Sequence, residues 1–407
     1  MSEKIDNIIV PKIYKYFISI LIFLIPSLLR GEEVNDSLLV TTPSSKNPFF
    51  FSLNAQSGAV FQTNDFVINE GINSFSSIAL KFCQASKGDK WQDYAYGMPY
   101  FGIGFYMATF HDQRLGTPFS FYLVQGARIF PITQKISFNY EFNLGYSTNW
   151  KHYDRFDNPD NVAIGMSENI HVGANLYFKI KPFPRMDVNV GFSLSHFSNG
   201  ARRLPNKGMN LAAPYIEICY NINPPEPREK PEQPLLPPKI EKRVDHDLLL
   251  TFSSRQLFYG PTNGLTTGYV DHKFRVFGLS YAPMIVSNYA FKWGPSLDIV
   301  YDESGGSTAS REQWEVDGEY YDRVKLGDVE QRIGVGLSAK GELVMPYFSI
   351  FVNMGYNVYH GNPKDKPFYQ IIGTKFPFYR NFFGTFGIRA NHFSKAQFIF
   401  WSAGYTI

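Results

Sequence analysis

The sequence predicts an all-β protein, an antiparallel β-barrel of the outer membrane. Strand-like segments of about ten residues recur along the chain, which is the length that a transmembrane β-strand needs. Short turns alternate with longer polar loops, as they do at the two ends of a membrane barrel. Aromatic residues make up 17% of the 407 residues and charged residues only 18%, a balance that is typical of strands rather than of a helical enzyme.

The first 31 residues have the pattern of a secretory signal peptide. Three lysines precede a short apolar run at 16–29, YFISILIFLIPSLL. The run is short for a membrane span and contains Pro26, so we expect cleavage, with a retained N-terminal anchor as the alternative. No second apolar run reaches the length of a membrane helix, so the exported chain is either a soluble β-protein or an outer-membrane barrel.

Eight strands are predicted in the first half of the chain, and alternation along them indicates which faces are apolar. In 186–198, one face carries Val190, Phe192 and finally His196 and Ser198, whereas the opposite face is small and polar. An apolar outside and a polar inside fit a narrow barrel in lipid. A soluble sandwich would alternate too, but the signal peptide and the aromatic strand ends favour the barrel. The eight predicted strands lie near 48–60, 74–85, 97–110, 116–130, 135–149, 168–181, 186–198 and 209–222.

A connector rich in Pro and charged residues, 224–242, interrupts the strands and is too long for a barrel turn. A second set follows, and we expect the acidic stretch between 302 and 330 to be a loop. The second set of predicted strands lies near 245–257, 266–282, 288–302, 330–344, 346–360, 367–376, 381–393 and 396–407.

The two halves resemble each other, which indicates a duplicated eight-strand unit. KPFPRMDVNVGFSLSHFS (181–198) is similar to KFPFYRNFFGTFGIRANHFS (375–394). We therefore expect two tandem barrels, with a single sixteen-strand barrel as the alternative. The predicted organisation is a signal peptide at 1–31, an N-terminal segment at 32–47, a first barrel repeat carrying the site at 48–222, a Pro-rich linker at 223–243 and a second, degenerate repeat at 244–407.

A candidate site lies in LSHFSNGARRLPNKGMN, residues 194–210. The side chains of His196 and Ser198 leave the same face of a strand, with Cα atoms about 6.6 Å apart. An imidazole can bridge that spacing for base-assisted attack by the hydroxyl. Asn210 lies across the hairpin on that face, where its side-chain carbonyl can hold the ring. Asn199 or a backbone N–H near Gly200 can stabilise an oxyanion. Polar groups on a lipid-facing surface are costly, which favours a function for this pair.

The residues HFSNG followed by PNKGMN resemble the lipid A 3-O-deacylase (PagL) family, whose pattern is close to H-[FY]-S-N-[AG]…P-N-x-G-[ILM]-E. The resemblance implies an eight-stranded outer-membrane barrel that hydrolyses the ester-linked acyl chain at the 3-position of lipid A. It implies a His-Ser-Glu triad on the lipid-facing surface, with His196 as the base, Ser198 as the nucleophile and Asn199 at the oxyanion. The resemblance covers the first half of the chain well and the second half only faintly.

Two departures from the family pattern affect the expected activity. Asn210 stands where the family has Glu, and Glu217 has the wrong parity to replace it, so we expect activity to be lower or absent. In the second half His392 and Ser394 remain, but Lys395 stands at the Asn199 position and no Pro-Asn-x-Gly loop follows. We expect this half to be structural.

The expected substrate is lipopolysaccharide, through its lipid A moiety, within outer-membrane lipid. The cationic residues Arg202, Arg203 and Lys207 stand beside the site and can bind lipid A phosphates, an ordinary surface loop being the alternative. The net charge of +3 gives no sign of a nucleic-acid partner, and homo-oligomers are left open. The sequence has no zinc-ligand spacing, no phosphate-binding loop and no G-x-S-x-G elbow, so no cofactor or metal is expected. The alternative functions are a non-catalytic lipopolysaccharide-binding barrel or pore, and a phospholipase-like esterase. The pairing of Cys83 and Cys219 is left open.

Overall fold

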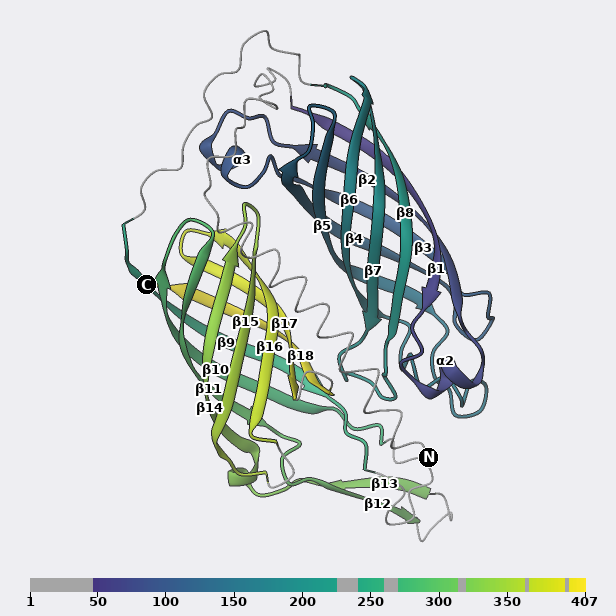
Figure 1. The fold of residues 1–407 in the computed structure, drawn as a ribbon. Helices are drawn as coiled ribbons and strands as arrows, with labels where there is room; N and C mark the ends of the chain where they lie inside the picture. The colour runs from purple at the N-terminus through teal and green to yellow at the C-terminus, as the bar shows by residue number, and fades with distance from the viewer. Residues whose placement is uncertain (1–46, 225–240, 260–269, 314–319, 363–365, 392–394) are drawn as a thin grey trace. The chain divides into compact units, whose positions relative to one another are not determined.

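The computed structural model describes residues 47–224, 241–259, 270–313, 320–362, 366–391 and 395–407. Within them the chain forms two closed antiparallel barrels of eight strands each (Figure 1). The predicted all-β class and the tandem barrels are confirmed, and the single sixteen-strand barrel is wrong. The predicted signal peptide and most of the predicted linker lie outside the described residues. No helix among the described residues is long and apolar enough to cross a membrane.

The first barrel pairs its strands in chain order and closes where β1 meets β8. Its strands are β1 (Phe49–Val60), β2 (Ser74–Ala85), β3 (Tyr100–Thr109), β4 (Gly116–Pro131), β5 (Ile136–Trp150), β6 (Asn169–Phe183), β7 (Met186–Ser198) and β8 (Met209–Asn221). Two short helices, α2 (Asp65–Asn69) and α3 (Trp91–Ala95), were not predicted, and they lie at opposite ends of this barrel (Figure 1). A single turn of helix gives no periodic signal in the sequence, although the Asn64 side chain caps α2 by accepting from Val67 N at 3.0 Å.

The second barrel closes where β18 meets β9. Its strands are β9 (Val244–Arg255), β10 (Phe274–Val286), β11 (Phe291–Asp302), β14 (Ile333–Val344), β15 (Ser349–His360), β16 (Phe368–Tyr379), β17 (Phe382–Asn391) and β18 (Lys395–Thr406).

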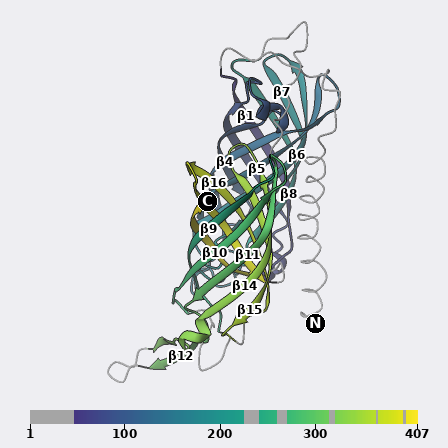
Figure 2. The same cartoon turned by 90° about the vertical axis from the view of Figure 1, so that its left-hand side faces the viewer.

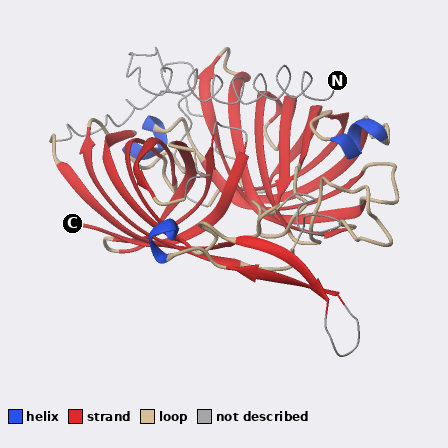
Figure 3. Ribbon diagram, turned by 90° about the horizontal axis from the view of Figure 1, so that it is seen from below, coloured by secondary structure: helices blue, strands red, loops and turns tan. Residues whose placement is uncertain are grey.

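The prediction of a loop between 302 and 330 was wrong. This stretch contains a hairpin of β12 (Thr308–Gln313) and β13 (Tyr320–Lys325), followed by a 3₁₀ turn, η3 (Val329–Arg332). The hairpin extends from one end of the second barrel (Figures 2 and 3). Its acidic residues are interspersed with β-forming ones such as Tyr320, Tyr321 and Val324, and the overall acidity hid that propensity.

The outer surfaces of both barrels are apolar, and their interiors hold buried charged and polar side chains beside clusters of buried apolar and aromatic ones. On the first barrel Ile103 and Phe121 are each 60% exposed, and on the second Leu250 is 54% exposed. Lys81 and Glu217, by contrast, are buried inside the first barrel. A soluble sandwich would bury its apolar faces, so this inverted pattern confirms the predicted outer-membrane barrel.

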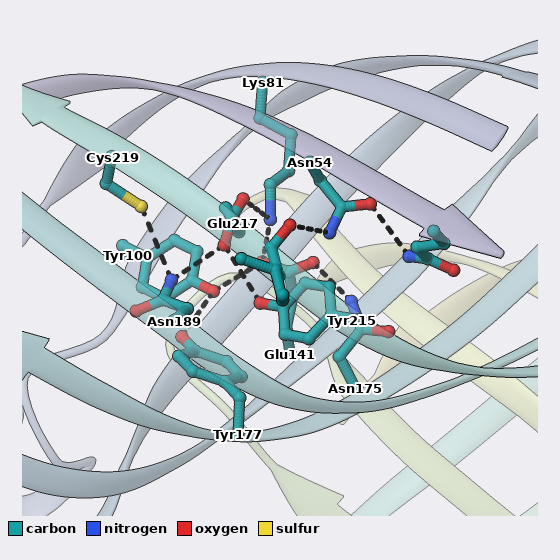
Figure 4. Close-up of polar contacts among 12 residues, drawn as sticks. Asn54, Lys81, Tyr100, Glu141, Asn175, Tyr177, Asn189, Tyr215, Glu217 and Cys219 are labelled. Carbon is teal, nitrogen blue, oxygen red and sulfur yellow. Dashed lines mark hydrogen bonds and ion pairs between the residues drawn. The ribbon is translucent and has the colours of Figure 1, made fainter.

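An ion network fills the middle of the first barrel (Figure 4). Lys81 Nζ lies 2.6 Å from Glu141 Oε2 and 2.6 Å from Glu217 Oε1. The Tyr100 hydroxyl donates to Glu141 at 2.6 Å, and the Tyr215 hydroxyl donates to Glu217 at 2.9 Å. The amides of Asn175 and Asn189 donate to the same two carboxylates. Side chains thus occupy the lumen at this level, which argues against a water-filled pore through this barrel.

The two cysteines are free and buried on the lumen side of the first barrel. Cys83 belongs to β2 and Cys219 to β8, strands that both flank β1. Asn189 donates a hydrogen bond to Cys219 Sγ at 3.4 Å. The question of their pairing is therefore answered: they form no disulfide.

Candidate active site

The candidate residues lie at the end of the first barrel that carries the longer loops. Loops 61–73, 110–115, 151–168 and 199–208 join strands at this end, whereas the opposite end includes the short turns 132–135 and 184–185. In outer-membrane barrels the longer loops face the outside of the cell. His196 and Ser198 are thus at the height where β7 leaves the membrane on its outer side.

Three predicted residues form one hydrogen-bonded chain. His196 Nε2 lies 2.9 Å from Ser198 Oγ, and His196 Nδ1 lies 2.7 Å from Asn210 Oδ1. Because the Asn210 oxygen can only accept, Nδ1 carries the ring proton, and Nε2 is left to accept from the Ser198 hydroxyl. This tautomer is the one in which a histidine can act as a base toward the serine.

The strand register explains why the three side chains meet. His196 on β7 pairs directly with Asn210 on β8, and Ser198 lies two residues further along β7 on the same face. The predicted parity is also correct for Glu217, which points into the lumen and binds Lys81. Glu217 therefore cannot replace the carboxylate that the family pattern places at position 210.

Residues before α2 bind the far side of Asn210. Asn210 Nδ2 donates to Thr63 Oγ1 at 3.1 Å. Phe61 N donates to the Asn210 backbone carbonyl at 2.9 Å, which places this segment directly against the start of β8. Sequence reasoning missed Thr63, because 147 residues separate it from Asn210 and it lies outside any recognisable motif.

The loop that follows Ser198 is held by hydrogen bonds from two other loops. Lys207 N donates to Val162 O at 3.1 Å, and Gly208 N donates to Ala163 O at 2.9 Å. Asn64, the cap of α2, donates its side-chain amide to Gly208 O at 3.2 Å. The loops 61–73 and 151–168 therefore fix the position at which β8 begins.

Gly208 is required by its surroundings. Its φ of +77° lies in the left-handed region, and a Cβ there would lie 2.9 Å from His196 Cε1 and 3.1 Å from Phe197 O. Any larger residue would strain the backbone and press on the imidazole. The Gly of the Pro-Asn-x-Gly motif thus has a direct steric role beside the base.

The two predicted oxyanion residues have different surroundings. The Asn199 backbone N–H already donates to Asn206 Oδ1 at 3.2 Å, so that N–H is engaged within the loop. An oxyanion role then rests on the Asn199 side chain and on the N–H of Gly200, as a prediction. Asn206 was missed as a site residue, although it is the Asn of the quoted Pro-Asn-x-Gly motif.

The remaining predicted residues lie apart from the hydrogen-bonded chain. Arg202, Arg203 and Lys207 are exposed in the loop 199–208. His392 and Ser394 of the second copy lie outside the described residues. Within the described ranges no three His, Cys, Asp or Glu side chains are grouped so that they could hold a metal ion.

An ion cluster holds the loop 110–115 against α2. Arg114 forms ion pairs with Glu70 and with Asp112, the latter at 2.6 Å, and its guanidinium lies over the Phe66 ring at 5.4 Å. Hydrogen bonds from Arg114 lower the pKa of Asp112. This cluster stabilises the same segment that supplies Thr63 and its neighbour Asn64 to the site.

Comparison with known proteins points to one family. Residues 246–407 match the family model described as the acyloxyacyl hydrolase C-terminal domain, PagL_C. No curated protein matches the chain. Among solved structures, the outer membrane enzyme PagL is similar with 19% identity and a TM-score of 0.29, covering 41% of this chain and 97% of that one. Neisserial surface protein A is similar with 8% identity and a TM-score of 0.29, covering 44% of this chain and 98% of that one.

The family match falls on the second barrel, where the sequence resemblance is faint. The quoted HFSNG and PNKGMN residues lie in the first barrel, and the likeness between the two halves links it to the second. The match supports an outer-membrane acyl hydrolase as the general class of the protein. Residues 246–407 thus match the family to which the sequence motif of the first barrel is similar.

Proposed function

We propose that the first barrel is a lipid A 3-O-deacylase, which hydrolyses an ester-linked acyl chain of lipopolysaccharide in the outer membrane. The observation that carries the proposal is the chain from Ser198 through His196 to Asn210, with contacts of 2.9 and 2.7 Å. By strand parity it lies on the outward face of the barrel, the face that meets lipid. The family of the second barrel supports the class of reaction.

The reaction follows from the hydrogen-bond directions. Ser198 Oγ attacks the ester carbonyl carbon while its proton moves to His196 Nε2. The tetrahedral intermediate collapses when Nε2–H protonates the sugar oxygen that leaves, and the acyl group stays on Ser198. A water molecule then gives its proton to the same nitrogen and attacks the acyl-enzyme, which releases the fatty acid and restores the serine. Asn199 and Gly200 stabilise the two oxyanions.

Asn210 sets an upper limit on the rate. Its carbonyl dipole orients the imidazole and favours the reactive tautomer, but it carries no charge to stabilise the imidazolium that forms during attack. Replacing Asn210 by Glu restores the carboxylate of the family pattern. We expect Asn210→Glu to keep or raise the rate of acyl release.

The cationic residues of the adjacent loop fit the phosphates of lipid A. Guanidinium groups bind phosphate in bidentate geometry, and Arg202 and Arg203 are exposed beside the site. Their replacement by alanine is expected to raise KM and to leave kcat nearly unchanged, because they lie outside the hydrogen-bonded chain. A change confined to kcat would show that they do not bind the headgroup.

The direct test is a substrate panel with the purified full chain in detergent. One arm contains lipid A with its 3-linked acyl chain, and the other contains a glycerophospholipid of matched chain length. Mass spectrometry is expected to show loss of one 3-linked acyl group from lipid A and no reaction in the second arm. Release from the glycerophospholipid alone would favour the phospholipase-like esterase. Release in neither arm would leave a non-catalytic lipopolysaccharide-binding barrel.

A further inference from the structure

An amide can replace the carboxylate of a catalytic triad only if its oxygen end, and not its nitrogen end, is held toward the histidine. A carboxylate presents two equivalent acceptors, so either oxygen can face the histidine. An Asn side chain has one accepting and one donating end. If Asn210 turned over, Nδ2 would donate to His196 Nδ1, the ring proton would move to Nε2, and the nitrogen that faces Ser198 could no longer accept its proton.

The contacts around Asn210 supply a partner for its donating end. Asn210 Nδ2 donates to Thr63 Oγ1 at 3.1 Å, on the side away from the 2.7 Å contact with His196. A hydroxyl can also donate, so its own proton must be directed elsewhere. The Phe61 carbonyl lies 3.5 Å from Thr63 Oγ1 and takes that role. The donor direction then runs one way: Ser198 donates to His196, His196 to Asn210, Asn210 to Thr63, and Thr63 to Phe61.

The position of Thr63 is itself fixed relative to Asn210. Phe61 N donates to Asn210 O at 2.9 Å, and Thr63 N donates to Phe61 O at 2.8 Å. Asn64, the next residue, binds Gly208 O at 3.2 Å and caps α2. The Thr63 hydroxyl is thereby held by backbone contacts on both sides and does not depend on the Asn210 side chain for its place.

We propose that Thr63 is a positioning residue of the hydrolase: it holds the Asn210 amide with its oxygen toward His196, and so sets the reactive histidine tautomer. This inference rests on the proposed function for its effect on rate. Its effect on the tautomer does not depend on turnover. Thr63 thus accounts for how a chain that has Asn in place of the family's Glu retains a working orientation of the base.

The test compares Thr63→Val, which keeps the shape and removes the hydroxyl, with Thr63→Ser, which retains it. One hydrogen bond contributes a net of about 0.5–1.5 kcal/mol, which corresponds to a change of about 2- to 13-fold in the ratio of the correct to the reversed amide orientation. Thr63→Val is expected to lower kcat by up to that factor with little change in KM, and Thr63→Ser to remain near the unmodified protein. Equal losses in both variants would overturn the proposal.

A second readout separates this inference from the proposed function. The ¹⁵N shifts of the His196 ring, assigned by their disappearance in His196→Gln, report the tautomer in detergent micelles whether or not acyl chains are released. Thr63→Val is expected to shift the ring toward the Nε2–H form. In an Asn210→Glu background the same substitution is expected to leave the tautomer unchanged, because a carboxylate can only accept. An unchanged tautomer in both backgrounds would overturn the role of Thr63. A shifted tautomer in a protein that releases no acyl chain would support that role and refute only the proposed hydrolase function.

Discussion

Replacing Lys81 by methionine should destabilise the first barrel strongly. Lys81 has a side chain 3% exposed and contacts two carboxylates, of Glu141 and Glu217, whose side chains are 1% and 2% exposed. In the described part of the chain no other cation pairs with either of them. Removing one partner from a buried ion pair costs about 3–5 kcal/mol because a charge is left without compensation, and here two carboxylates lose theirs. We therefore expect a loss at or above the upper end of that range.

The second barrel provides a matched control. Lys375 contacts Asp247 at 2.6 Å and Glu342 at 3.5 Å, but Lys340 also lies 3.6 Å from Asp247. Lys375→Met therefore leaves a cation beside Asp247, and the loss should be smaller than for Lys81→Met. Neutralising both first-barrel carboxylates as well, in Lys81→Met with two Glu→Gln changes, should recover much of the stability.

The assay is the free energy of unfolding by urea titration in detergent micelles, followed separately for each barrel. If Lys81→Met lost less than about 1 kcal/mol, the lumen would be wetter and the charges better screened than their burial indicates. If the neutral triple variant were no better than Lys81→Met alone, the loss would come from packing and the electrostatic reasoning would be refuted.

Three further predictions concern the loops and the lumen. Gly208→Ala should lower acyl release by about tenfold or more, since its Cβ would lie 2.9 Å from His196 Cε1 and a small misplacement of a catalytic group is costly; a fully active and normally folded Gly208→Ala protein would contradict the close packing. The pKa of Asp112 is lowered by hydrogen bonds from Arg114, so its contribution to loop stability is present above the ordinary carboxyl pKa and is lost as the pH falls through the lowered one. Hydrogen exchange in the loop 110–115 should accelerate in that acid range, and Asp112→Asn should weaken the pH dependence. Planar-bilayer recordings should show no large, stable pores, because each barrel has eight strands and an interior of that size is filled by side chains.

The strands could be predicted from the sequence because two patterns mark them: the alternation of apolar and polar residues, and the likeness of the two halves of the chain. Alternation with period two assigned Asn189 and Glu217 to the lumen and Phe192 to lipid, and the structure confirms each of these faces. Register followed from the same parity, so the pairing of His196 with Asn210 was within reach of the sequence. The duplication gave the number of strands in each barrel.

The parts that escaped prediction depend on contacts between distant segments. Thr63 reaches Asn210 only because the barrel closes between β1 and β8, and no local pattern marks a threonine in a loop as a hydrogen-bond acceptor. Asn206 is in a recognisable motif, but its role in binding the Asn199 N–H depends on the path of the loop. The hairpin of β12 and β13 escaped prediction because its strands lie in an acidic stretch, and such a composition is more typical of a loop.

The most direct test of the proposed site compares Ser198→Ala with Ser394→Ala in the purified full chain. The two serines follow the same His-Phe pair in the two halves of the sequence, and only Ser198 is followed by the Asn-Gly pair and the Pro-Asn-x-Gly loop. The second copy keeps the histidine but has Lys395 at the Asn199 position, and an oxyanion donor contributes on the order of 10² in rate, so this copy should add nothing measurable. Mass spectrometry of lipid A should show that Ser198→Ala abolishes release of the 3-linked acyl chain and that Ser394→Ala leaves it nearly unchanged. Full activity in Ser198→Ala, or loss of activity in Ser394→Ala alone, would contradict the assignment of the site to the first barrel.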